Sequence, residues 1–239
     1  MGIIVPAILP SSRADLKGKL SLFVGIPSVE RIQIDVVDGI FATPACWPYT
    51  APEEFRAMLE QEETLPHPER IAYEIDLMCA DAELAVQDWL TLGASRLTFH
   101  AESVSELPRL LAFVRERYGS GGGFATGLIS FGVALNLETD LALIEPVLQE
   151  VEYVQFMGIA QIGRQGQPLD DRVFDKLRIF HTRHPNIAMQ VDGGVTLQNA
   201  KKLLSIGVSQ LVVGSALSRA ESPKATLAAF EDLKPSFGV

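Results

Sequence analysis

Short apolar runs rich in β-branched residues alternate along the chain with longer stretches of helical periodicity. Eight of these runs predict strands, at Ile3–Leu9, Arg31–Val36, Ile71–Leu77, Arg96–Phe99, Phe131–Leu135, Tyr153–Met157, Ile187–Val191 and Gln210–Val213. The stretches between them predict helices, among them Pro52–Gln61, Ala82–Leu92, Val104–Tyr118, Asp170–His181, Leu197–Ile206 and Pro223–Leu233. Strands and helices in this alternation are typical of a (β/α)8 TIM barrel, an α/β fold.

The length of 239 residues fits one such barrel, so we expect residues 1–239 to form a single domain. A doubly wound open sheet is the alternative. No Gly-x-Gly-x-x-Gly motif follows the first predicted strand, however, and we expect no nucleotide cofactor. The glycine-rich run Gly119–Gly123 precedes the fifth strand, on the face away from barrel active sites, and we interpret it as a flexible loop.

Polar residues at the C-terminal ends of the predicted strands are the candidates for chemistry, because barrel active sites lie at that face. They are Gln33, Asp35, Asp38, Glu74, Asp76, His100, Asn136, Gln155 and Asp192. Gln33 and Asp35 alternate with isoleucines and should point into the barrel. Buried carboxylates are costly unless they are paired, hydrogen-bonded or bound to metal. Asp35, Asp76 and Asp192 near one mouth therefore indicate a functional site, with loop capping as the alternative for each.

The lysines and cysteines lie at positions that do not indicate a catalytic nucleophile or a metal site. No lysine ends a predicted strand, so a Schiff-base aldolase lacks its nucleophile. Cys46 and Cys79 have no metal-type spacing, and we interpret them as structural thiols of a reducing compartment. His100 does end a strand, where both a hydrogen-bonded structural role and a catalytic role remain open.

Glycines follow the seventh and eighth predicted strands, the usual phosphate position of such barrels. A short helix that begins near Ser215 would aim backbone N–H groups at an anion. A third glycine-containing segment, after the sixth strand, is placed to close over the same group, and Arg164 in it offers a charged contact. The candidate phosphate or substrate contacts are Gly163, Gly166, Gly193, Gly194, Gly214 and Ser215.

The net charge of −10 argues against nucleic acid or an anionic membrane as a partner, because either needs a basic patch. No apolar run approaches the ~18 residues of a membrane span. The first residues also lack the basic start and cleavage site of a signal peptide. We therefore expect a cytoplasmic protein that holds an anionic substrate by local backbone groups.

Seven short segments, spread from the first predicted strand to the last, form a specific pattern. They are Pro6-Ala7-Ile8-Leu9, Asp35-Val36-Val37-Asp38-Gly39-Ile40-Phe41, Asp76-Leu77-Met78, Thr98-Phe99-His100-Ala101-Glu102, Ala134-Leu135-Asn136, Val191-Asp192-Gly193-Gly194-Val195 and Val213-Gly214-Ser215-Ala216. Together they resemble motifs of the ribulose-phosphate 3-epimerase family, whose second motif reads Asp-Val-Met-Asp-Gly-His-Phe. The resemblance covers essentially the whole chain and implies a (β/α)8 barrel.

The resemblance also implies an activity, the inversion of C3 of a pentulose 5-phosphate through an enediolate. By matching position, Asp35 and Asp192 would be the acid/base pair, one on each side of the carbon. A phosphorylated ketose such as ribulose 5-phosphate would be the substrate, with Met157 and His100 as possible further contacts. Members of the family are commonly oligomeric, so a homo-oligomer is expected.

The chain departs from the family at its metal ligands. The family binds a divalent metal through two histidines and the two aspartates, and the histidine positions here hold Gln33 and Asp76. Three carboxylates and an amide oxygen, from Gln33, Asp35, Asp76 and Asp192, would form a hard oxygen site, which favours magnesium or manganese over zinc or iron. If no metal binds, repulsion among the carboxylates should raise at least one pKa. Ala7 and Gln165 also replace a serine and a glycine of the family pattern.

An epimerase is the leading interpretation, and two others stay open. One is a phosphosugar-binding barrel that has lost its chemistry and serves as a sensor or an assembly partner. The other is a related magnesium-dependent sugar-phosphate lyase, although Met78 stands where those lyases would have a lysine. The two aspartates favour an enzyme, because a binder gains nothing from burying two carboxylates beside an anion.

Overall fold

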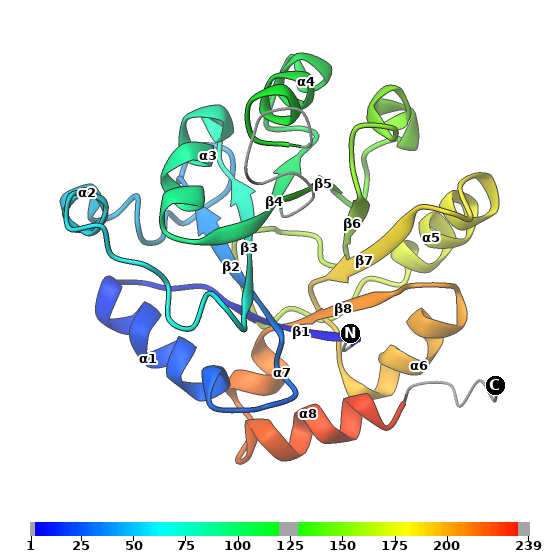
Figure 1. The fold of residues 1–239 in the computed structure, drawn as a ribbon. Helices are drawn as coiled ribbons and strands as arrows, with labels where there is room; N and C mark the ends of the chain where they lie inside the picture. The colour runs from blue at the N-terminus through cyan, green and yellow to red at the C-terminus, as the bar shows by residue number, and fades with distance from the viewer. Residues whose placement is uncertain (1–2, 120–128, 234–239) are drawn as a thin grey trace.

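The computed structural model describes residues 3–119 and 129–233. Within these residues, parallel strands pair in chain order and close into a barrel, because β8 pairs with β1 as well as with β7. The strands are β1 (Ile4–Ile8), β2 (Arg31–Val37), β3 (Ala72–Met78), β4 (Ala94–His100), β5 (Ser130–Leu135), β6 (Tyr153–Met157), β7 (Ala188–Asp192) and β8 (Gln210–Val213). The predicted TIM barrel is confirmed (Figure 1).

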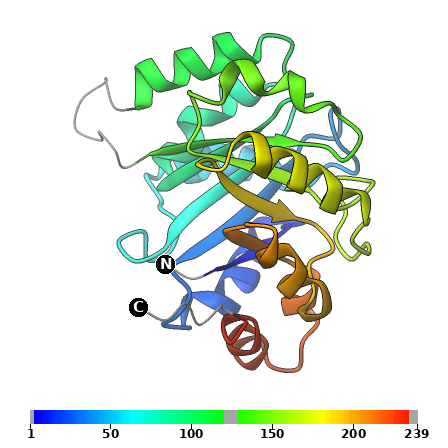
Figure 2. The same ribbon diagram turned by 90° about the vertical axis from the view of Figure 1, so that its right-hand side faces the viewer.

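Helices surround the strands on the outer side of the barrel, as both views show (Figures 1 and 2). They are α1 (Arg13–Val24), α2 (Pro52–Glu60), α3 (Ala82–Thr91), α4 (Leu107–Tyr118), α5 (Arg172–Arg183), α6 (Leu197–Ser205), α7 (Ser215–Ser218) and α8 (Pro223–Glu231). Between β5 and β6 the chain forms the 3-10 turns η1 (Leu141–Leu143) and η2 (Glu145–Val147). Among the described helices, none has the length and apolar character needed to cross a membrane.

The helices differ from the predicted ones mainly where apolar periodicity is a weak guide. Apolar periodicity gives no bounds for α1, whose buried residues are Leu16, Leu20 and Phe23. Its start is fixed locally, because the Ser12 hydroxyl accepts a hydrogen bond from the backbone of the first turn. The short helix expected near Ser215 is present as α7. Most of the run Gly119–Gly123 lies outside the described residues.

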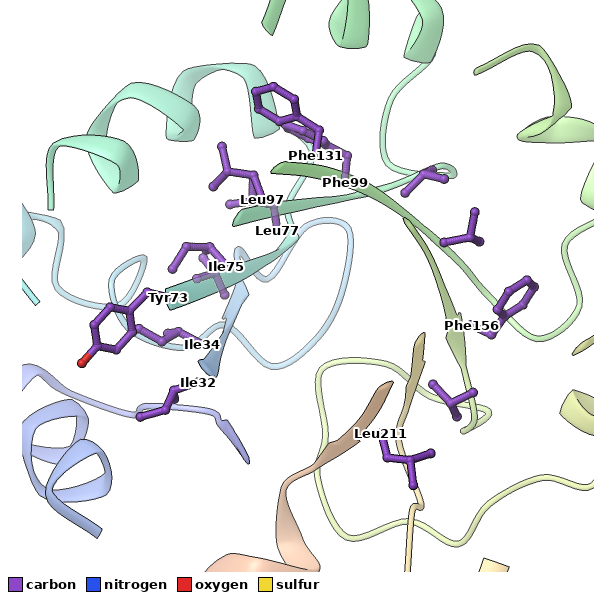
Figure 3. Packing of buried hydrophobic residues seen from close by; sticks show 14 of the residues in the cluster. Ile32, Ile34, Tyr73, Ile75, Leu77, Leu97, Phe99, Phe131, Phe156 and Leu211 are labelled. Carbon is purple, nitrogen blue, oxygen red and sulfur yellow. The ribbon is translucent and has the colours of Figure 1, made fainter. Parts of the chain in front are cut away.

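Alternate side chains of the strands point outward and pack against the helices (Figure 3). On β2 and β3 these fully buried residues are Ile32, Ile34, Val36, Tyr73, Ile75 and Leu77. Since side chains alternate along a strand, the intervening positions face the barrel interior. Gln33 and Asp35 therefore point inward, as predicted.

The middle of the barrel interior is polar, although such interiors are usually filled by branched apolar residues. The buried carboxylate of Glu74 on β3 lies 2.9 Å from Arg96 Nε and 3.8 Å from Arg31 Nη1. The Arg96 guanidinium also covers the ring of Tyr153, at 4.0 Å from its centroid. On β5, a Cβ at Gly132 would lie 2.2 Å from the Tyr153 ring, so glycine leaves the space that the ring fills. This ion-paired layer forms the floor beneath the strand ends.

Candidate active site

Three aspartates meet above this floor, at the C-terminal end of the barrel. Asp35 on β2 and Asp76 on β3 are register partners, and Asp192 is the last residue of β7. One carboxylate oxygen from each lies within 4.8 Å of the other two, and all three residues are buried. Strands β2 and β7 are separated by β1 and β8, so Asp35 and Asp192 reach the mouth from different sides. The carboxylates lie together, as expected from the sequence.

Burial and mutual repulsion make two of these carboxyl groups unusually basic. Removal from water is the largest cause for Asp35 and raises its pKa to about 7, with the charge of Asp76 adding to the rise. Burial first, and then the charges of Asp35 and Asp76, raise the pKa of Asp192 well above its ordinary value. The Asp35 carboxyl group can therefore hold or release a proton near neutral pH, which is what a general acid or base requires, and Asp192 keeps its proton to a higher pH than an ordinary carboxyl group does.

Two glutamine amides hold the carboxylate of Asp35. Gln33 Nε2 donates to Asp35 Oδ1 and to Asp192 Oδ2, both at 2.8 Å. Gln165 Nε2, from the loop after β6, donates to Asp35 Oδ2 at 3.2 Å. Both amides favour the charged form of Asp35 and so oppose the rise in its pKa. Gln33 turns its nitrogen toward the carboxylates, whereas an amide oxygen is expected of a metal ligand at this position.

His100 at the end of β4 is fully buried behind the aspartates. Its Nε2 lies 3.0 Å from Asp76 Oδ1, and its ring contacts that of Phe41 at a centroid distance of 5.3 Å. Burial opposes the charged imidazolium, but the Asp76 carboxylate outweighs it and raises the pKa of His100. Within the described residues, the other oxygen of Asp76 has no hydrogen-bond partner. A buried carboxylate oxygen in that state is suited to a cation or a proton.

The expected phosphate segments converge on one cavity of about 40 Å³ beside the aspartates. Its walls include Asp35, Asp192, Met157, Gly163, Gln165, Gly166, Gly193, Gly194, Gly214 and Ser215. All six candidate phosphate contacts therefore surround the space onto which both aspartates open. Among the described residues, Asp76 and His100 do not line this cavity.

Close packing of the loops explains why glycine is needed at two of these positions. Gly194 has φ of +70°, and a Cβ there would lie 2.3 Å from the backbone nitrogen of Leu169. Gly166 has φ of +88°, and a Cβ there would lie 2.6 Å from Arg219 Nη2. Arg219, which directly follows α7, thus brings a guanidinium to the outer edge of the glycine loops. Sequence patterns give no sign of this arginine, because it lies on neither a strand end nor a glycine motif.

Several other candidates from the sequence do not join the cluster. Asp38 accepts hydrogen bonds from the backbone of its own loop and of residue Ala80, so it stabilises the loop after β2. Gln155 lies deeper in the barrel, where its amide meets Met157 Sδ at 3.6 Å. Asn136 lines a separate pocket near Glu138. Arg164 donates to the Thr43 carbonyl at 3.2 Å, which ties the loop after β6 to the loop after β2.

The two cysteines are buried and unpaired. Burial raises the pKa of Cys46 and of Cys79 to about 12 each. Thiols in this state are poor nucleophiles, in agreement with the structural role expected for them.

Comparison with known sequences gives a family match. Residues 3–218 match the model of the ribulose-phosphate 3 epimerase family. The chain is similar to ribulose-phosphate 3-epimerase of Schizosaccharomyces pombe, with 22% identity over 221 residues that cover 92% of this chain and 89% of that protein. It is also similar to the chloroplastic ribulose-5-phosphate-3-epimerase of Arabidopsis thaliana, with 28% identity over 219 residues that cover 90% of this chain and 71% of that protein.

Solved structures of similar shape include KGPDC from Streptococcus mutans, with a TM-score of 0.68, 14% identity and 100% coverage of both chains. The 3-hexulose-6-phosphate synthase from Salmonella typhimurium has a TM-score of 0.63 and 15% identity, with 98% of both chains covered. At this level of identity, the likeness shows a common barrel fold.

Proposed function

Because the chain belongs to the ribulose-phosphate 3-epimerase family, we propose that it is a sugar-phosphate isomerase that inverts C3 of a ketose phosphate such as ribulose 5-phosphate. The observation that carries this proposal is the pair of buried carboxylates on β2 and β7. Asp35 and Asp192 line one cavity together with the glycine loops. A substrate whose phosphate binds those loops would present a neighbouring carbon to both carboxylates.

Proton transfer is the role of the two aspartates. One carboxylate removes the proton from C3 to leave an enediolate, and the carboxylic acid opposite returns a proton to the other face. The reverse reaction exchanges the two roles. Raised pKa values support this assignment, since the pKa of Asp35 is about 7 and burial also raises that of Asp192. A carboxyl group that titrates near the working pH serves both as base and as acid.

The three aspartates are a suitable donor set for a divalent cation. Asp35, Asp76 and Asp192 offer hard oxygen ligands within 4.8 Å of one another, and Asp76 has an oxygen without a partner among the described residues. We assign the cation to these three residues and favour magnesium or manganese over zinc or iron, since the three clustered donors are all carboxylate oxygens. When bound, such a cation supplies positive charge that stabilises the oxygens of an enediolate.

Phosphate recognition falls to the backbone of the glycine loops. Gly193 and Gly194 after β7, and Gly214 and Ser215 after β8, face the cavity. A chain with a net charge of −10 repels an anion at long range, so close backbone N–H groups must supply the attraction. The loop that contains Gly163 and Gly166 completes the wall on the remaining side.

Turnover of ribulose 5-phosphate by the purified full-length chain, with and without Mg²⁺ or Mn²⁺, tests the proposal. Asp35→Asn and Asp192→Asn should each lower kcat by about 10²- to 10⁴-fold, the usual contribution of a general acid or base. Asp175→Asn is the matched control, because Asp175 pairs with Arg178 on the outer surface of α5. Absence of turnover with every ketose phosphate tried, in either metal condition, would refute the assignment and favour a binding protein.

A further inference from the structure

Gln33 joins two residues that the barrel itself does not hold together. Strands β2 and β7 are separated by β1 and β8, so no backbone hydrogen bond sets the position of Asp35 relative to Asp192. The Gln33 amide spans this gap, since Nε2 lies 2.8 Å from Asp35 Oδ1 and 2.8 Å from Asp192 Oδ2. An amide NH2 has two hydrogens, and here each of them is directed to a different carboxylate.

From this geometry we propose that Gln33 is a positioning residue, which fixes the separation and the rotamers of Asp35 and Asp192. The proposal rests on the proposed function, because it gives these two aspartates the work of proton transfer. A general base must approach its proton to within hydrogen-bond distance, and a misplacement of about 1 Å can cost about 10²-fold in rate. A rigid bridge between both bases holds each one at its own face of the substrate.

The surroundings of Gln33 determine which way its amide points. If the amide turned over, its oxygen would face two carboxylate oxygens, and three acceptors would meet in a buried space. In the observed orientation, Gln33 Oε1 accepts a hydrogen bond from Gln190 Nε2 at 3.3 Å. Gln190 Nε2 shares its two hydrogens among Gln33, Gln155 and Glu74, and the contact with Glu74 anchors Gln190 in the ion-paired layer of the interior. The bridge is therefore oriented by the scaffold before substrate arrives.

The Gln33 bridge also leaves one oxygen of each aspartate uncovered. Gln33 contacts one oxygen of each carboxylate, so it leaves the second oxygen of each, Asp35 Oδ2 and Asp192 Oδ1, without a contact to Gln33. Gln165, which contacts Asp35 Oδ2 at 3.2 Å, comes from a loop and not from the barrel wall. Gln33 thus acts through the two aspartates and touches no reacting atom itself.

Gln33→Met is the direct test, because methionine keeps the unbranched length and removes both N–H groups. Gln155→Met is the matched control. Gln155 is an equally buried amide on β6, and its hydrogen bonds go to Gln190 and Met157 instead of to an aspartate. With ribulose 5-phosphate, Gln33→Met should lower kcat by about 10²-fold and change KM by less than about 3-fold. Gln155→Met should change both by less than about 3-fold.

A crystal structure of each metal-free variant provides a readout that is independent of turnover. In Gln33→Met, at least one of the two carboxylates should leave its wild-type position, while both keep it in Gln155→Met. Unchanged carboxylates or an unchanged kcat in Gln33→Met would overturn the proposal. If the wild type turns over no ketose phosphate, the proposed function fails, and the two structures still decide whether Gln33 positions the pair.

If Gln33→Met does not fold, Gln190→Met replaces it. That variant removes the Gln190 N–H group that donates a hydrogen bond to Gln33 Oε1, and it leaves the Gln33 side chain intact. Release of the amide should lower kcat by at least about 5-fold without a comparable rise in KM. A kcat equal to that of the wild type would count against an oriented bridge.

Discussion

Asp35→Asn should flatten the pH dependence of stability in the metal-free protein. The folded-state pKa of Asp35 is about 7, against an ordinary value of 3.8. Between these two values, the folded protein holds a proton that the unfolded chain has already released. Raising the pH through this window therefore favours unfolding, and the wild type should lose stability from about pH 4 to about pH 7.

The size of the stability loss follows from the rise in the pKa of Asp35. Each pKa unit corresponds to about 1.4 kcal/mol, so a rise of about three units costs about 4 kcal/mol once the carboxyl group is ionised. Asparagine keeps the shape of the side chain and removes this ionisation. It also removes a charge that helps to raise the pKa of Asp192, so the second aspartate should contribute less as well.

Urea unfolding in EDTA at pH 5 and at pH 7.5 measures the effect, with Asp175→Asn as the exposed control. The wild type and the control should lose several kcal/mol between the two pH values, and Asp35→Asn should lose clearly less. Mn²⁺ added to the wild type at pH 7.5 should restore about 2.7 kcal/mol at a concentration of 100 Kd. Equal losses for the wild type and Asp35→Asn would refute the idea that burial of Asp35 sets this dependence.

Three further predictions concern the interior, the phosphate loops and the thiols. Glu74→Gln leaves Arg96 without its buried carboxylate partner and should cost about 3–5 kcal/mol in urea unfolding. Glu138→Gln, at the solvent-exposed Arg172 pair, should leave the urea midpoint unchanged, and similar effects of both changes would contradict the interior role. Gly214→Ala places a Cβ 2.8 Å from Gln165 Nε2 and should raise KM for the sugar phosphate about 10-fold. Gly18→Ala meets no atom within 4 Å and should leave KM unchanged, and an equal effect of both changes would argue against a crowded loop. A thiol reagent at pH 8 should label Cys46 and Cys79 only after unfolding, because burial raises the pKa of each to about 12, and rapid labelling of the native protein would contradict this.

Strand order and barrel closure were predictable from the sequence because every strand packs in the same way. Each one packs an apolar face on the helices, so runs such as the isoleucines around Gln33 and Asp35 are visible without any tertiary information. Helix α1 is less visible, since it buries only a few residues, among them Leu16 and Leu20. The turns η1 and η2 are too short to show a period.

The aspartate cluster was predictable for the same reason, and its partners were not. Asp35, Asp76 and Asp192 stand at strand ends, whose meeting point is fixed by the fold. The contact of Gln165 with Asp35 depends on the path of a loop. The amide orientation of Gln33 depends on neighbours from other strands, and these relations appear only when the chain is folded.

Exchange of the C3 hydrogen with solvent tests the two-aspartate account most directly. Ribulose 5-phosphate and its C3 epimer are incubated separately in D2O with the wild type, Asp35→Asn, Asp192→Asn and the double variant, and deuterium at C3 is followed by NMR. The account predicts that the wild type exchanges and interconverts both epimers. Each single variant should exchange one epimer only, the opposite one in each case, without interconversion, and the double variant should exchange neither. Interconversion by either single variant at the wild-type rate, or exchange of the same epimer by both, would contradict the assignment of one aspartate to each face.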